Sequence, residues 1–280
     1  MAITPLLMIK VLLAASMVLG LARIAERVGP EWAGLLSGAP LGVALVLFFY
    51  GIEQGVEYAA AAAFFALFGL MAALVFAYLF VILVPHNKGS APWPLIGALA
   101  GYGAAAALLL QLLQLLGVSL VGGTHGKVPG LPLVLPIAMV AAALALGVGL
   151  ILRRQPVSRF GSARLSRRQQ GIRAVVAALL VVMITALAHC LTPAAAGVLA
   201  GFPLVLFALM LVLQWHHGSG PVAAVVSHFP FGMGSLILYT LTVTLTYPTW
   251  GLIAGTAVSM LVALLYLVLL GLWRHKRTHR

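Results

Sequence analysis

Hydrophobic runs separated by short polar stretches fill almost the whole chain. Runs of about 20 apolar residues are long enough to cross a bilayer as helices. We expect each run to be helical, because lipid offers no hydrogen-bond partner to a backbone that is not satisfied within its own segment. Nine spans are predicted, at residues 5–22, 31–51, 58–84, 94–116, 131–152, 172–189, 193–214, 221–247 and 248–273.

The amino-acid composition agrees with this pattern. Of the 280 residues, 63% are hydrophobic and 7% are charged, and the mean hydropathy is +1.16. A soluble domain carries about 25% charged residues. The chain is therefore predicted to be an all-α polytopic membrane protein with the lipid bilayer as its main partner. Its single cysteine, Cys190, excludes an intramolecular disulfide and a multi-cysteine metal site.

Basic residues set the expected orientation. In a soluble protein the net charge of +12 would suggest nucleic-acid binding, but here Lys and Arg gather at span ends and divide 14 to 2 between the two sides. This positive-inside bias predicts a bacterial cytoplasmic (inner) membrane protein, with no nucleic-acid partner. The N-terminus is then outside, whereas the 153–173 loop and the C-terminus are cytoplasmic. Lys10 is expected to reach the membrane surface, and Glu53 and Glu57 are expected in an outer loop as solvated charges.

A Gly-x-x-x-Gly-x-Pro motif occurs twice, 163 residues apart and inside a predicted span each time. A Phe-Gly dipeptide recurs at the same offset. The matched residues are Gly34, Gly38, Pro40, Phe68 and Gly69 in the first copy, and Gly197, Gly201, Pro203, Phe231 and Gly232 in the second.

The motifs belong to a longer repeat in which the first four spans return as the last four. Residues 1–117 form the first four-helix repeat, residues 118–170 hold a connector span with a basic cytoplasmic loop, and residues 171–280 form the second repeat with a basic tail. Five spans separate equivalent helices, and this odd number makes the copies face opposite ways. Such a 4+1+4 inverted-topology repeat is the layout of many secondary transporters.

Part of the first repeat resembles a known family. Residues 25–29, 34–40 and 47–55, together with Phe68-Gly69, are similar to the GlpM-like family of small, four-span bacterial membrane proteins. The resemblance covers the first half of the chain, whereas the second half keeps only the Gly, Pro and Phe-Gly positions. It implies a fold and no substrate, because the family has no established activity.

The two proline motifs are the candidate site. A proline lacks an N–H, so Pro40 should leave the Leu36 carbonyl, and Pro203 the Leu199 carbonyl, without a helical partner. Transporters use broken helices near the bilayer midplane to bind solutes. An intramembrane histidine, His228, is a further candidate. The predicted binding residues are Ser37, Gly38, Pro40, Phe68, Gly69, Gly201, Pro203, His228, Phe231 and Gly232.

Two functions remain open from the sequence. No enzyme motif, cofactor motif or metal-ligand spacing is found, so we predict no catalysis, no cofactor and no metal. The first function is a secondary transporter or flippase for a neutral or anionic small solute or a lipid-linked compound, because the predicted spans hold no deep carboxylate that would bind a cation. The alternative is a non-transporting membrane scaffold or assembly factor, in which the glycines only pack helices. Filling Gly38 or Gly201 with leucine should block transport and leave the protein folded. A homodimer stays open as the assembly.

Overall fold

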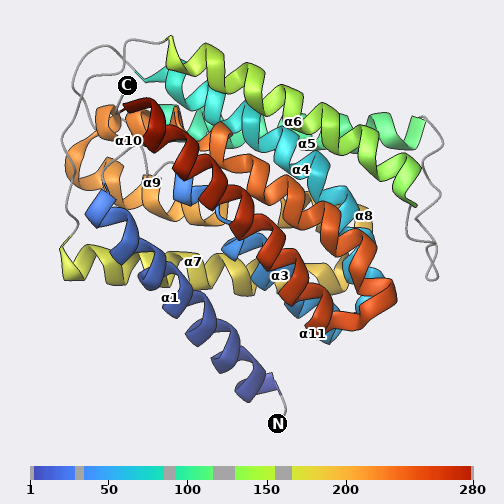
Figure 1. The fold of residues 1–280 in the computed structure, drawn as a ribbon. Helices are drawn as coiled ribbons and strands as arrows, with labels where there is room; N and C mark the ends of the chain where they lie inside the picture. Colours follow the sequence, from blue (N-terminus) through green and yellow to red (C-terminus); the bar gives the residue numbers. More distant parts are fainter. Residues whose placement is uncertain (1–2, 29–34, 85–91, 116–129, 155–165, 279–280) are drawn as a thin grey trace.

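The computed structural model describes residues 3–28, 35–84, 92–115, 130–154 and 166–278, and every element in these ranges is a helix (Figure 1). This confirms the all-α prediction for the described residues. The elements are α1 (Ile3–Val28), α3 (Leu41–Glu53), α4 (Val56–Leu83), α5 (Trp93–Leu115), α6 (Leu131–Arg153), α7 (Arg167–Leu187), the short 3-10 helix η2 (Ala188–Cys190), α8 (Pro193–Ala200), α9 (Leu204–His217), α10 (Ser219–Val226) and α11 (Phe229–Thr278).

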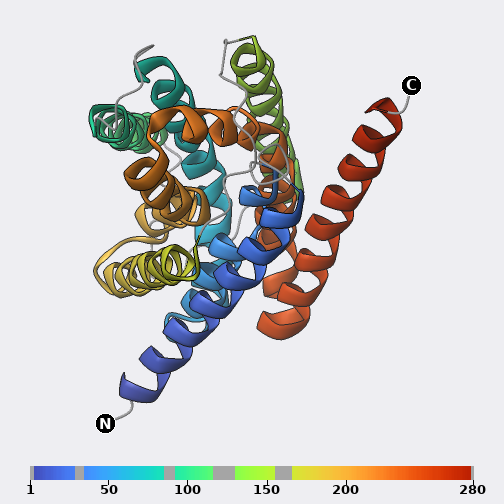
Figure 2. The same ribbon diagram turned by 90° about the vertical axis from the view of Figure 1, so that its left-hand side faces the viewer.

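Several of these helices are long enough to span a membrane. Six described helices are long and apolar enough to cross a bilayer, and the bent pair α8–α9 raises this number to seven. Large apolar side chains cover the outer surface of the bundle, as on the second half of α11, where Ile253 is 80% exposed and Leu261 is 67% exposed. That part of α11 stands at the edge of the bundle in Figure 2. An apolar surface of this extent indicates a membrane-embedded protein.

Helix α4 lies at the centre of the bundle. It packs against α5, α8, α11 and α6, and each residue from Ala59 to Leu70 is less than a tenth exposed. A helix that is apolar on every side is expected to be buried on every side. Small residues fill much of this helix, so its neighbours can approach closely.

Both predicted helix breaks are present in the structure. Helix α3 begins directly after Pro40, and α9 begins directly after Pro203. Helices α8 and α9 are bent by 45° at the second break. The broken segments come from distant parts of the chain and lie within the bundle, where α4 contacts α3 and α8.

Several helix boundaries differ from the sequence prediction, and three have a clear physical cause. Helix α7 begins at Arg167 rather than at residue 172, because Ser166 and Gln169 form a reciprocal capping box. The span expected at 221–247 is interrupted at residues 227–228, since Pro230 cannot donate an N–H to the preceding turn and instead lies in the first turn of α11. The boundary expected at Pro248 is a kink at Gly251, whose φ of 75° is accessible to glycine.

Candidate functional site

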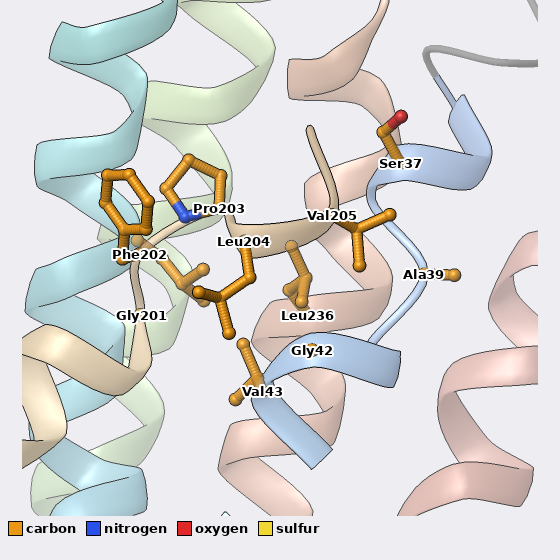
Figure 3. A pocket seen from close by; sticks show the side chains of 11 residues that line it. Ser37, Ala39, Gly42, Val43, Gly201, Phe202, Pro203, Leu204, Val205 and Leu236 are labelled. Carbon is orange, nitrogen blue, oxygen red and sulfur yellow. The ribbon is translucent and has the colours of Figure 1, made fainter. Parts of the chain in front are cut away.

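A small cavity lies between the two helix breaks (Figure 3). Its volume is about 10 Å³, close to the smallest space that holds one water molecule. Ser37 is the polar residue of an otherwise apolar lining, and its oxygen points away from the other lining side chains in Figure 3. Three predicted site residues, Ser37, Gly201 and Pro203, line this cavity. The other lining residues are Ala39, Gly42, Val43, Leu70, Phe202, Leu204, Val205 and Leu236.

Beside this cavity, four glycines among the predicted site residues form two close contacts between helix backbones. A Cβ atom built on Gly69 would lie 3.0 Å from the Cα of Gly201, and one built on Gly232 would lie 3.1 Å from the Cα of Gly38. Any side chain would therefore push the two backbones apart. Each pair joins one motif from the first half of the chain to one motif from the second half.

Four backbone carbonyls at the breaks find hydrogen-bond partners within the protein. The Leu36 and Leu199 carbonyls, expected to lose their helical partners, accept N–H groups three residues on, at 2.9 Å from Ala39 and 3.0 Å from Phe202. Because the Phe202 N–H bonds to Leu199, the carbonyl left without a helical partner in α8 is that of Val198. The Tyr102 hydroxyl donates to this carbonyl at 2.7 Å. In the first break, the Ser235 hydroxyl donates to the Gly38 carbonyl. Hydroxyl groups from neighbouring helices thus make an interrupted helix tolerable inside a membrane protein.

The two predicted phenylalanines are not among the residues that line the cavity. Phe68 packs on the aromatic rings of α4, with its centroid 5.7 Å from that of Phe64. Phe231 packs against α6, where its ring faces Gly149 and the Arg153 guanidinium lies 5.5 Å from the ring centroid. Leu70 and Leu236 contribute the α4 and α11 walls of the cavity instead.

His228 lies in the break between α10 and α11 and is also absent from the cavity lining. Its Nδ1 atom is 2.9 Å from the Ala224 carbonyl oxygen and 3.2 Å from the Ser227 hydroxyl. The Ser227 hydroxyl donates to the same carbonyl at 2.9 Å. These contacts give His228 a local role in closing the end of α10.

A buried polar cluster was missed by the sequence prediction. The Lys10 ammonium of α1 lies 2.7 Å from Oε1 of Glu53, the last residue of α3, and donates to the Thr185 hydroxyl of α7 at 2.8 Å. Lys10 is 6% exposed and the Glu53 side chain is 11% exposed. The expectation of a solvated Glu53 and a Lys10 reaching the membrane surface is therefore wrong, because the two charges satisfy each other inside the bundle.

The cluster extends to η2. His189 places Nε2 3.6 Å from Oε2 of Glu53 and Nδ1 2.8 Å from the side-chain nitrogen of Gln54. The Lys10 ammonium also lies 5.3 Å from the centroid of the Phe49 ring. One signal in the sequence points to this cluster. Lys10 is the lone charge inside the first predicted span, and a charge at that depth requires a partner.

No family model matches the chain, and neither the comparison with curated proteins nor the comparison with solved structures gives a match. Membership of the GlpM-like family stays a prediction. The geometry of the breaks and of the polar cluster is therefore the basis for assigning a function.

Proposed function

We propose that the chain is a secondary transporter or flippase built from two inverted four-helix repeats around α6, with its site between the helix breaks. The element bounds support such a repeat. Helix α3 begins at Leu41 and α9 at Leu204, α4 begins at Val56 and α10 at Ser219, and both offsets are 163 residues. Gly55 and Gly218, also 163 apart, precede α4 and α10 with φ angles of 99° and 77°.

The observation that carries the proposal is an exchange of contacts between the two motifs. Gly38 meets Gly232, and Gly201 meets Gly69, so the same contact occurs twice with the roles of the two halves exchanged. The Leu35 carbonyl faces Gly232, and the Val198 carbonyl faces Gly69 in the same way. Reciprocal contacts of this kind are what a two-fold relation between two copies produces. With an odd number of spans between equivalent helices, that axis lies in the membrane plane.

The position of the breaks favours transport. They meet at a cavity inside the bundle, where irregular backbone is tolerated if it is buried or lines a solute path. The cavity lining contains a hydroxyl and no carboxylate, which suits a neutral or anionic solute or a lipid-linked compound better than a cation. The cavity holds about one water molecule, so binding requires the two halves to separate from this closed arrangement.

A membrane scaffold or assembly factor is the second candidate. The same small volume favours it, together with the hydrogen bonds that close both breaks. In this case the glycine contacts hold the two halves together permanently. Binding of a solute at the cavity separates the two functions, because a scaffold has no reason to admit one.

We expect reporter fusions to place the two termini on opposite sides of the membrane, with the C-terminus in the cytoplasm. The reason is the 14 to 2 division of basic residues and the nine spans predicted from the sequence. Helix α1 also begins, and helix α11 ends, at opposite ends of the bundle in Figures 1 and 2. A cytoplasmic reporter at each terminus in turn measures this, and two termini on one side would reject both the topology and the inversion.

Replacing Ser37 with alanine is expected to weaken solute binding by about two- to tenfold, the effect of losing one hydrogen bond. A thermal-shift screen on the purified protein first identifies a solute, and uptake into proteoliposomes then measures transport. Ser16→Ala is the matched control, because the Ser16 hydroxyl is exposed on α1 and bonds only to the nearby Leu13 carbonyl among the described contacts. Equal uptake by Ser37→Ala and the parent protein would move the site elsewhere, and a screen without any solute would favour the scaffold.

A further inference from the structure

The buried polar cluster ties together helices from the two halves of the chain. Lys10 and Glu53 come from α1 and α3, whereas Thr185 and His189 come from α7 and η2. The contacts Lys10–Thr185 and Glu53–His189 therefore cross between the proposed repeats, at the end of the bundle where α3 ends. Separation of the halves at this end has to break both contacts.

One carboxylate oxygen of Glu53 is not satisfied. Oε1 faces the Lys10 ammonium, but Oε2 is buried and has no hydrogen-bond partner among the described residues. The nearest cationic group for Oε2 is Nε2 of His189, at 3.6 Å, which is longer than a hydrogen bond. A buried polar atom without a partner usually marks a place where a proton, an ion or a water molecule binds.

His189 can bring a proton to this oxygen from water. Its side chain is 53% exposed, so the imidazole has direct access to solvent on one side and to Glu53 on the other. The Gln54 amide nitrogen lies 2.8 Å from Nδ1, so Nδ1 of the neutral ring accepts and the ring hydrogen is on Nε2, towards Glu53. Histidine is the side chain best suited to change its charge near neutral pH.

We propose that Glu53 and His189 form a proton-binding site, and that the bound proton holds this end of the molecule closed. A proton from water adds to Nδ1 of His189. The Gln54 amide then turns so that its carbonyl oxygen accepts a hydrogen bond from the new Nδ1–H. The imidazolium then donates from Nε2 to Oε2 of Glu53, which makes the contact between η2 and α3 an ion pair. Loss of the proton to water reverses each step.

Other titratable groups around the site are already engaged or exposed. Lys10 of α1 is paired with Oε1 of Glu53. On α3 and α4, the Tyr50 and Tyr58 hydroxyls donate to the Ala196 and Ala188 carbonyls at 3.1 and 3.0 Å. Glu57 of α4 and Cys190 of η2 are exposed to solvent. Among the described residues, His189 is the group that faces both water and the free carboxylate oxygen.

Coupling of this proton to solute movement rests on the proposed transport function. A ligand shifts an equilibrium only by its different affinity for the two states. The proton binds to the closed arrangement, in which His189 and Glu53 are adjacent, and is released when the halves separate. Lower pH therefore favours closure at this end, and higher pH favours opening. The proton therefore regulates opening at this end of the proposed transporter.

The test measures opening directly and uses no solute. Ala14 lies one helical turn after Lys10, is 1% exposed, and faces Ala177 and Val181 of α7. In a Cys190→Ser background, Ala14→Cys gives a single thiol that a polar maleimide reaches only when the halves separate. The labelling rate in lipid nanodiscs is divided by the rate for the unfolded protein at the same pH, which removes the pH dependence of the thiol itself.

We expect the normalised labelling rate to rise about two- to fivefold from mildly acidic to mildly alkaline pH. This is the change in the population of the open form that follows from losing an ion pair with one exposed partner. His189→Gln should abolish this rise. So should the Lys10→Met/Glu53→Gln double variant, which leaves no buried charge unpaired. Glu57→Gln, the exposed control, should keep it.

A rate without pH dependence in the parent protein, or a full rise in His189→Gln, would overturn the proton site. A rise that survives in the double variant would overturn the role of Glu53. These results are separate from the transport proposal, because a scaffold with this site would show the pH-dependent labelling without uptake, and a transporter without it would show uptake and flat labelling.

Discussion

Replacing Gly232 with alanine is expected to destabilise the folded protein by about 1–3 kcal/mol, the range for forcing extra atoms into a packed interior. The added Cβ would meet the Leu35 carbonyl and lie 3.1 Å from the Cα of Gly38. Both neighbours are backbone atoms, which cannot rotate away as a side-chain end can. Gly69→Ala should have a similar effect, since its Cβ would meet the Val198 carbonyl and the Cα of Gly201.

Gly147→Ala in α6 is the matched control for this prediction. No atom lies within 4 Å of a Cβ built at Gly147, so alanine there gains about 1 kcal/mol of helix propensity at most. Reversible unfolding in mixed micelles, followed by tryptophan fluorescence, measures all three variants. Gly69→Ala and Gly232→Ala variants as stable as Gly147→Ala would mean that the two halves do not meet at these glycines.

This contact changes how the site can be tested. Leucine at Gly38 was expected to block transport in a protein that still folds, but a Cβ at Gly38 would lie 2.6 Å from the Cα of Gly232. A Cβ at Gly201 would lie 2.7 Å from the Cα of Gly69. Loss of activity in such variants would report a lost helix contact rather than a blocked solute path. Ser37, which lines the cavity and has no glycine contact to lose, is the better position for a test of binding.

The sequence predicted the all-helical fold and the two proline breaks because those features are local, whereas the described residues hold six or seven helices of membrane-spanning length and do not confirm the nine predicted spans. Apolar runs fix where helices lie, and a proline removes an N–H wherever it occurs. The breaks before Leu41 and Leu204 follow from the residue type alone. Boundaries that depend on side-chain capping were less accurate, as at Ser166, where the Ser-x-x-Gln box starts α7 earlier than hydrophobicity indicates.

Contacts between distant residues could be predicted only in part. The recurring Gly and Phe-Gly motifs indicated which glycines matter, but not that Gly38 would meet Gly232 rather than Gly201. Tyr102, which closes the second break, lies 96 residues from its partner Val198 and carries no motif. Glu53 follows an apolar run, so it appeared to be a solvated charge at the end of a span. Its burial depends on Lys10 and on Thr185, which lies 175 residues from Lys10.

Lys10→Met is expected to lower the free energy of unfolding by about 3–5 kcal/mol, the effect of removing one partner of a buried ion pair. Methionine keeps the length of the side chain but leaves the Glu53 carboxylate, only 11% exposed, without the cation that lies 2.7 Å away. Glu53→Gln should be comparably destabilising, because the amide oxygen can still accept from Lys10 but carries no negative charge, which leaves the buried ammonium without a counter-ion among the described contacts.

The double variant Lys10→Met/Glu53→Gln separates charge pairing from packing. It removes both charges and keeps both side-chain volumes, so its stability should lie within about 1 kcal/mol of the parent protein. Glu57→Gln, an exposed carboxylate one helical turn away, should change stability by about 0.5 kcal/mol or less. Equilibrium unfolding of the parent protein, the two single variants and the double variant gives the coupling energy between Lys10 and Glu53 as a double-mutant cycle. A coupling near zero would mean that the pair behaves like a surface ion pair and does not hold α1 to α3. A large coupling would identify the pair as the contact that fixes the first helix of the chain on the bundle, since α1 otherwise meets α3 and α7 mainly through apolar side chains such as Ala14 and Met17.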